Sequence, residues 1–194
     1  MNKNRLEAFS DGVMAIIITV MVLELKRPDH ADFGALLQLV PVLLSYVLSF
    51  VYVGIYWNNH HHMLHATRRV NGRILWANLH LMFWISLFPF STAWMGENHA
   101  STAPTVVYGF VLLMAGCAYV LLQSAILADE GPSSLLARAV GRDWKGKISP
   151  VLYSAGIALS FVDPWLAIAV YTSVAVLWLV PDRRIERVLA QRES

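Results

Sequence analysis

The sequence predicts an all-α, polytopic membrane protein with six transmembrane helices. Of its 194 residues, 57% are hydrophobic and only 14% are charged, and its mean hydropathy is positive, which sets it apart from soluble globular domains. Apolar segments recur along the chain between short polar stretches, and the longer ones reach the roughly 20 residues that cross a hydrocarbon core as a helix. The sequence contains no G-x-S-x-G, H-E-x-x-H or glycine-rich phosphate motif, so we predict that the protein is not an enzyme.

The first predicted span, Arg5 to Leu25, opens with charged residues and then runs through Phe9, Ser10 and Asp11 into an apolar stretch. At about 1.5 Å per residue, a helix of this length reaches roughly 30 Å, the thickness of a hydrocarbon core. A carboxylate about two turns into such a helix is costly in lipid, so it should face protein or water. We therefore expect this helix to be packed inside an assembly and to be functional.

A helical wheel of the first span separates an apolar stripe from a polar cluster. At about 100° per residue, Ile16, Thr19 and Leu23 lie on one stripe, where the threonine hydroxyl is the only polar side-chain group. Ser10 and Asp11 are turned away from it. By itself the stripe also fits a lipid-facing or core surface. We expect Asp11 to form an ion pair with Arg5 at the membrane boundary.

The start of this span carries a motif that resembles a known family. The motif is R-x-x-x-F-S-D, formed by Arg5, Phe9, Ser10 and Asp11. It is similar to the signature of the transmembrane protein 175 family of potassium channels, and in particular to the bacterial members, which carry six spans once and assemble as homotetramers. Further matches to the second and third spans of that family are Trp57-x-x-His60, Asn78 and Pro89-Phe90. The motif matches cover residues 5 to about 90, while the rest of the chain agrees in span count only.

The resemblance implies a homotetramer in which the first helix of each copy lines a central pore. When the sequence is aligned on the aspartate of the motif, Ile16, Thr19 and Leu23 match the pore-lining positions, with Ile16 and Leu23 as hydrophobic constrictions. Potassium is then the permeant ion near Ile16 and Thr19, and it moves passively. The resemblance also implies that His60 and Asn78 hydrogen-bond the polar cluster and hold it in place. We expect no cofactor, no structural metal and no nucleic acid, and the partners are the lipid bilayer and further copies of the chain.

Five more spans follow in order. We predict them at Leu37 to Trp57, Ile74 to Trp94 (with Pro89 inside), Thr105 to Leu127, Ile148 to Val162 and Leu166 to Val180. The last two are short, about 22 Å each, and fit either two thin spans or a hairpin dipping into the bilayer; we favour two spans. The stretch 60–73 is expected to be a polar, basic connection, and residues 135–140 a short amphipathic helix. Residues 1–182 form one channel domain, followed by a basic cytoplasmic tail at 183–194.

The distribution of lysine and arginine predicts the orientation. Thirteen of the fifteen lysine and arginine residues lie on one side: at the N-terminus, in the second and fourth connections between spans, and in the tail. Only Lys26 and Arg27 lie on the other side. The positive-inside rule then places both termini in the cytoplasm of a multi-pass protein of the cell membrane.

Two other functions are considered. His61 and His65 stand at i and i+4, a spacing that zinc accepts, but no carboxylate or cysteine lies nearby in sequence, so we predict no metal site. A proton- or cation-coupled secondary transporter is the alternative to a channel; the only acids of the first span, Asp11 and Glu24, lie near its ends, which favours the channel. A non-conducting membrane scaffold ranks third. No T-V-G-Y-G-like segment occurs, so a pore would have to be built from side chains.

Overall fold

The computed structural model describes residues 2–131, 134, 137 and 144–179. Within these residues every regular element is a helix, which confirms the all-α prediction. The tail at 183–194 lies outside the described residues, as does nearly all of the amphipathic helix predicted at 135–140.

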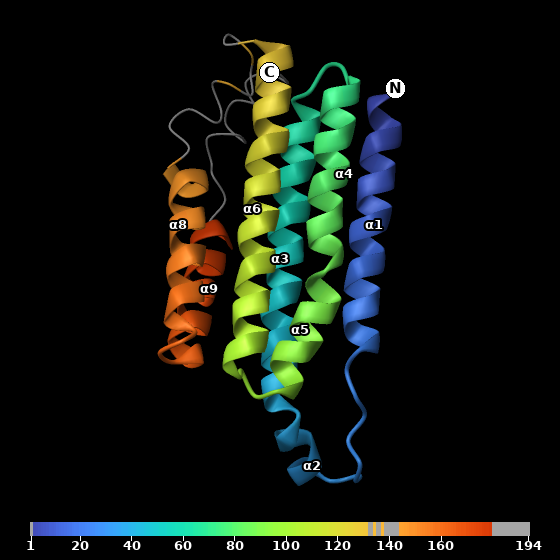
Figure 1. The fold of residues 1–194 in the computed structure, drawn as a ribbon. Helices are drawn as coiled ribbons and strands as arrows, with labels where there is room; N and C mark the ends of the chain where they lie inside the picture. The colour runs from blue at the N-terminus through green and yellow to red at the C-terminus, as the bar shows by residue number, and fades with distance from the viewer. Residues whose placement is uncertain (1, 132–133, 135–136, 138–143, 180–194) are drawn as a thin grey trace.

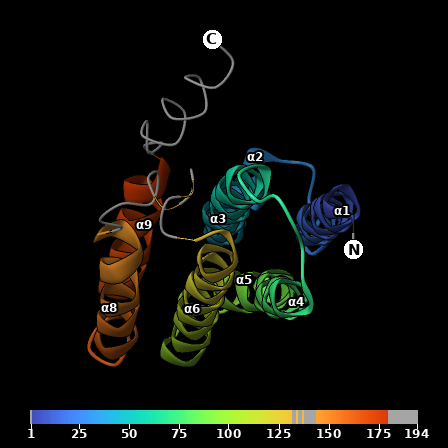
Figure 2. The same ribbon diagram turned by 90° about the horizontal axis from the view of Figure 1, so that it is seen from above.

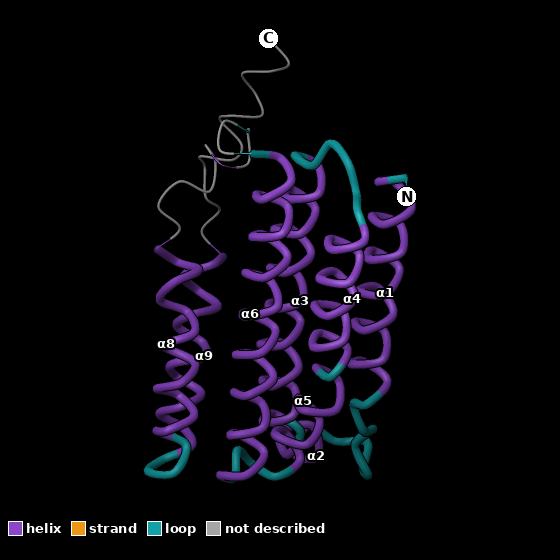
Figure 3. Tube along the Cα trace, turned by 45° about the horizontal axis from the view of Figure 1, so that its top comes forward, coloured by secondary structure: helices purple, strands orange, loops and turns teal. Residues whose placement is uncertain are grey.

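The helices follow the predicted spans closely (Figures 1 and 3). Their bounds are α1 Lys3–Leu23, α2 Phe33–Gln38, α3 Val40–His65, α4 Gly72–Ser86, α5 Phe88–Glu97, α6 Thr102–Glu130, α8 Trp144–Leu159 and α9 Pro164–Leu179. Four stretches among the described residues are long and apolar enough to cross a membrane: α1, α3, α4 together with α5, and α6. The shorter helices α8 and α9 have 16 residues each, or about 24 Å.

Two predicted boundaries are wrong. The third span is not one helix, because it breaks at Leu87 between α4 and α5. Pro89 explains the break, since it has no amide hydrogen and its ring clashes with the carbonyl group of Ile85, four residues earlier. The second difference is that α3 continues to His65, so the histidines expected in a loop are helical. Lys3 Nζ donates to the carbonyl oxygen of His65 at 2.8 Å, where a cation stabilises a helix C-terminus.

The helices form a bundle in which α1 stands at one edge (Figure 2). It packs against α3, α4 and α5. The hairpin of α8 and α9 lies on the opposite side, where α8 packs on α6. One side of α1 is therefore turned away from the rest of its chain.

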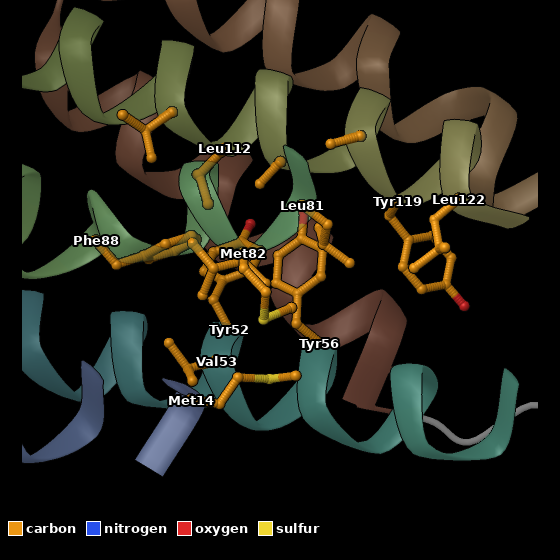
Figure 4. Close-up of a cluster of buried hydrophobic side chains, with 14 of the residues drawn as sticks. Met14, Tyr52, Val53, Tyr56, Leu81, Met82, Phe88, Leu112, Tyr119 and Leu122 are labelled. Carbon is orange, nitrogen blue, oxygen red and sulfur yellow. The ribbon is translucent and has the colours of Figure 1, made fainter. Parts of the chain in front are cut away.

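The core between α3, α4, α5 and α6 is rich in aromatic side chains (Figure 4). Tyr52 of α3 and Tyr108 of α6 are almost completely buried. The Tyr52 hydroxyl donates to the carbonyl oxygen of Tyr171 at 2.6 Å, and the Tyr108 and Ser49 hydroxyls lie 2.9 Å apart. Met14 brings α1 into this core beside Val53 of α3. The inner side of α1 is thus held by a dense, hydrogen-bonded scaffold.

Candidate functional site

Helix α1 has one buried side and one exposed side. The buried residues recur every three or four positions, as expected for a helix with one packed face: Leu6, Ser10, Met14, Ile17 and Met21. The three predicted pore-lining residues lie on the other side. Ile16 is 64% exposed, Leu23 is 76% exposed, and Thr19 is exposed between them. The fold of one chain therefore leaves this stripe free to face another molecule, lipid or water.

The hydroxyl group of Thr19 is partly engaged within its own helix. Its Oγ1 donates to the carbonyl oxygen of Ala15 at 2.8 Å, the usual back-bond of a threonine in a helix. The hydrogen is used by that bond, so the oxygen keeps lone pairs that can accept a hydrogen bond or contact a cation.

A buried chain of hydrogen bonds joins three helices behind this stripe. His60 Nε2 of α3 lies 2.7 Å from Asn78 Oδ1 of α4, and Asn78 Nδ2 donates to Ser10 Oγ of α1 at 3.0 Å. The three residues are at most 1% exposed. The amide oxygen can only accept, so His60 carries a hydrogen on Nε2. The structure thus brings together three of the predicted anchoring residues.

The other predicted members of the polar cluster are placed differently. Asp11 Oδ1 accepts a hydrogen bond from the indole Nε1 of Trp57 at 3.0 Å. Arg5 is exposed and forms no ion pair among the described residues of this chain, so the expected Arg5–Asp11 pair is wrong within a single chain. The six-residue separation explains this, because about 600° of rotation puts the two side chains on different sides of the helix. Phe9 is 48% exposed and does not join the network.

The contact of Trp57 with Asp11 is the feature of this site that sequence reasoning missed. The sequence motif includes Trp57, but its hydrogen bond to Asp11 spans 46 residues. The available signal was the i, i+3 spacing of Trp57 and His60, which places both on one face of a helix. That face meets α1: Trp57 bonds Asp11 directly, and His60 reaches Ser10 only through Asn78.

At the other end, an ion pair ties the end of α1 to α5. Lys26 Nζ lies 2.8 Å from Glu97 Oε1, and both side chains are exposed. The hydrogen bond and the charge of Glu97 raise the pKa of Lys26 above its ordinary value. Below this pair, α1 and the α4–α5 segment border a groove of about 680 Å³ whose wall includes Ile16.

The histidines at the end of α3 stack instead of converging on one point. The His61 ring lies 6.0 Å from the ring of Trp57 and 6.2 Å from that of His65, in stacked orientations. In the described part of the chain, no three potential metal ligands come together.

Comparison with known proteins gives consistent matches. Residues 5–89 match the family model described as "Endosomal/lysosomal potassium channel TMEM175". A potassium channel from Chryseobacterium sp. (strain P1-3) is 51% identical over 191 residues, which cover 98% of this chain and 100% of that protein. An endosomal/lysosomal proton channel TMEM175 from Danio rerio is 38% identical over 81 residues, which cover 35% of this chain and 16% of that protein.

The structure also resembles a solved one. The crystal structure of a lysosomal potassium-selective channel TMEM175 homolog from Chamaesiphon minutus superposes with a TM-score of 0.83 at 28% identity, covering 93% of this chain and 97% of that one. Sequence and structure thus agree over nearly the whole length of both chains. The chain belongs to the TMEM175 family of potassium channels.

Proposed function

We propose that this chain is the subunit of a potassium-preferring channel in which four copies surround a central pore lined by α1. One observation carries the proposal: Ile16, Thr19 and Leu23 are exposed on a helix whose opposite side is fixed by buried hydrogen bonds. A stripe that is exposed but held on a rigid support suits the wall of a passage between copies. The relative matched over its full length and the solved structure are both named as potassium channels, which supports potassium as the permeant ion.

In such a pore the side chains themselves form the barrier. A ring of four Ile16 side chains offers no oxygen to a cation, so an ion loses hydration there or passes when the ring dilates and wets. The Thr19 oxygens lie one turn further along and can replace part of the hydration shell, because their hydrogens are held by Ala15.

The same proposal includes the topology. The N-terminus of α1, the end of α3 and the start of α4 lie at one end of the bundle (Figure 1), and Lys3, Arg5 and Arg73 lie there too. We place this end in the cytoplasm of the cell, by the positive-inside rule. With α8 and α9 as two thin spans, the chain crosses six times and returns its C-terminus to the same side.

Cysteine modification on adjacent residues tests the pore assignment. Leu23→Cys and Val22→Cys are made in a Cys117→Ser background, and currents are recorded before and after a cationic thiosulfonate is added. Both native side chains are exposed, but about 100° of helix separates them. We expect the reagent to remove most of the current of Leu23→Cys and to leave Val22→Cys unchanged. An equal loss in both variants, or no loss in either, contradicts the assignment.

A second recording identifies the ion and the mode of transport. Purified protein in a planar bilayer under a potassium–sodium gradient should give a current that reverses near the potassium equilibrium potential and does not change when a tenfold proton gradient is imposed. A potassium flux that requires the proton gradient would support the coupled transporter instead. A current that reverses at the proton equilibrium potential would contradict potassium preference.

A further inference from the structure

Helices α4 and α6 border a groove of about 530 Å³ near the end of the bundle that holds the N-terminus. The two helices contribute stripes with spacings of three and four residues: Arg73, Trp76, Ala77 and His80 from α4, and Leu121, Ser124, Ala125 and Ala128 from α6. The helices are antiparallel, so Arg73 and Ala128 lie toward the end of the bundle and His80 and Leu121 lie deeper. Each stripe extends about 10 Å along the helix axis.

The residues of the groove suit a lipid chain. Ala77, Ala125 and Ala128 are small, and their short side chains leave the space between the two helices unfilled. Trp76 is 75% exposed beside this space, at the depth where tryptophans collect in membrane proteins, because the ring is apolar and its N–H is polar. Apart from Ser124 and His80, the groove is lined by apolar side chains between its ends, and Arg73 lies at its mouth.

The two acids at the end of α6, Asp129 and Glu130, have other partners than Arg73. Glu130 is used by Arg68: one carboxylate oxygen lies 3.7 Å from Arg68 Nε, and the other accepts the backbone N–H of Arg68. Asp129 accepts a hydrogen bond from the side chain of Asn71 at 2.8 Å. Arg73 is exposed and forms no ion pair with any residue that the structure describes.

We propose that the α4–α6 groove binds one anionic phospholipid of the leaflet on the side of the N-terminus. The guanidinium group of Arg73 pairs with the lipid phosphate, whose oxygens match the planar fork of arginine. One acyl chain lies along the alanines, with the Trp76 ring beside it. This site is separate from the α1 stripe and does not depend on conduction.

Native mass spectrometry of the purified protein tests the site by titration with phosphatidylglycerol and, separately, with phosphatidylcholine. Wild type should retain phosphatidylglycerol in preference to phosphatidylcholine. Arg73→Ala should weaken phosphatidylglycerol binding about fivefold, because the paired phosphate loses its arginine. The matched control is Arg69→Ala, which removes the same charge from the same connection but not from the groove, and it should bind nearly as wild type does.

A second variant tests the apolar part. Ala128→Leu keeps all charges and fills the groove from an exposed position, so it should also weaken phosphatidylglycerol binding. Wild-type binding by Ala128→Leu, or equal losses in Arg69→Ala and Arg73→Ala, would overturn the proposal in favour of diffuse charge attraction. Thermal stabilisation by sn-glycerol 3-phosphate equal to that by the lipid would show a free-phosphate site and would overturn it too.

Discussion

Asn78 uses the two ends of one amide group to join two other helices to its own. Its oxygen accepts from His60 of α3, and its nitrogen donates to Ser10 of α1. No shorter residue could reach both partners, and a hydrocarbon side chain could bond neither. Asn78 therefore links α1 to both α3 and α4, in addition to the packing of the buried side of α1.

We expect Asn78→Ala to destabilise the protein strongly. The change leaves the buried His60 and Ser10 groups without partners, at about 1–3 kcal/mol for each unmade bond, so the melting temperature in detergent should fall by several degrees. Asn58→Ala, at an exposed position of α3, is the control and should melt as wild type does. The double variant Ser10→Ala/Asn78→Ala should lose less stability than the sum of the losses of the two single variants. Strictly additive losses would mean that the two residues do not interact.

Ile16→Asn should raise the single-channel conductance or the open probability and weaken discrimination among cations. The substitution puts a polar group where the proposed pore offers only hydrocarbon. Because Ile16 is 64% exposed, its removal opens no cavity within the chain, so the 2–5 kcal/mol cost of a buried truncation does not apply. Planar-bilayer recordings measure the effect, with Val22→Asn as a control of the same chemistry. Wild-type currents from correctly assembled Ile16→Asn protein would show that ions do not pass along α1.

At the scale of whole helices, hydrophobic periodicity and segment length predicted most of the fold. The features that they did not predict depend on contacts between distant segments. The long apolar runs of α1, α3 and α6 determine those spans on their own. The polar residues at the end of α3 were predicted to form a connection between helices, because the sequence does not show that His60 has a buried hydrogen-bond partner. The stripe of α1 was predictable because its residues are three and four positions apart, but the Trp57–Asp11 bond joins distant segments and leaves no local pattern.

Gly156→Ala should loosen the α8–α9 hairpin. A Cβ atom at this position would lie 2.3 Å from a ring carbon of Tyr171, and that side chain is fully buried, so the ring cannot swing into solvent. We expect a loss of about 1–3 kcal/mol from overpacking, measured as a lower melting temperature. Gly54→Ala in α3 is the control, because an added Cβ there meets no atom within 4 Å; it should be neutral or slightly stabilising. If both variants melt alike, the hairpin does not pack as described.

The Lys26–Glu97 pair should make stability depend on alkaline pH. The pKa of Lys26 is raised by Glu97 above its ordinary 10.5, so the pair contributes fully below that value and is lost as pH rises through the raised pKa. The melting temperatures of wild type and Lys26→Gln should therefore differ by a small, constant amount below pH 10 and converge above it. The effect is small because both side chains are exposed to solvent. A difference that persists unchanged to high pH would mean that the charge of Lys26 is not what ties the two helices.

At the scale of the whole molecule, α1 lies at one edge of the bundle, where neighbouring copies can contact it (Figure 2). In the proposed pore each chain contributes one α1, so we expect several copies to close it. We expect native mass spectrometry in mild detergent to give four subunits, and cross-linking to stop at four. Disruption of the Ser10–Asn78 bond should lower the tetramer fraction. A pure monomer that still conducts would place the pore inside one chain.

The hydrogen bond between Ser10 and Asn78 also sets an order for biosynthesis. The two residues are 68 positions apart, and at about 5–20 residues per second the ribosome needs roughly 3–14 s to make the intervening chain. During that interval Ser10 of α1 lacks its partner, and buried polar groups are costly without partners. The first helix to be made therefore reaches its final orientation only when α3 and α4 arrive, and a nascent chain that stalls before Asn78 should be a target for quality-control proteolysis.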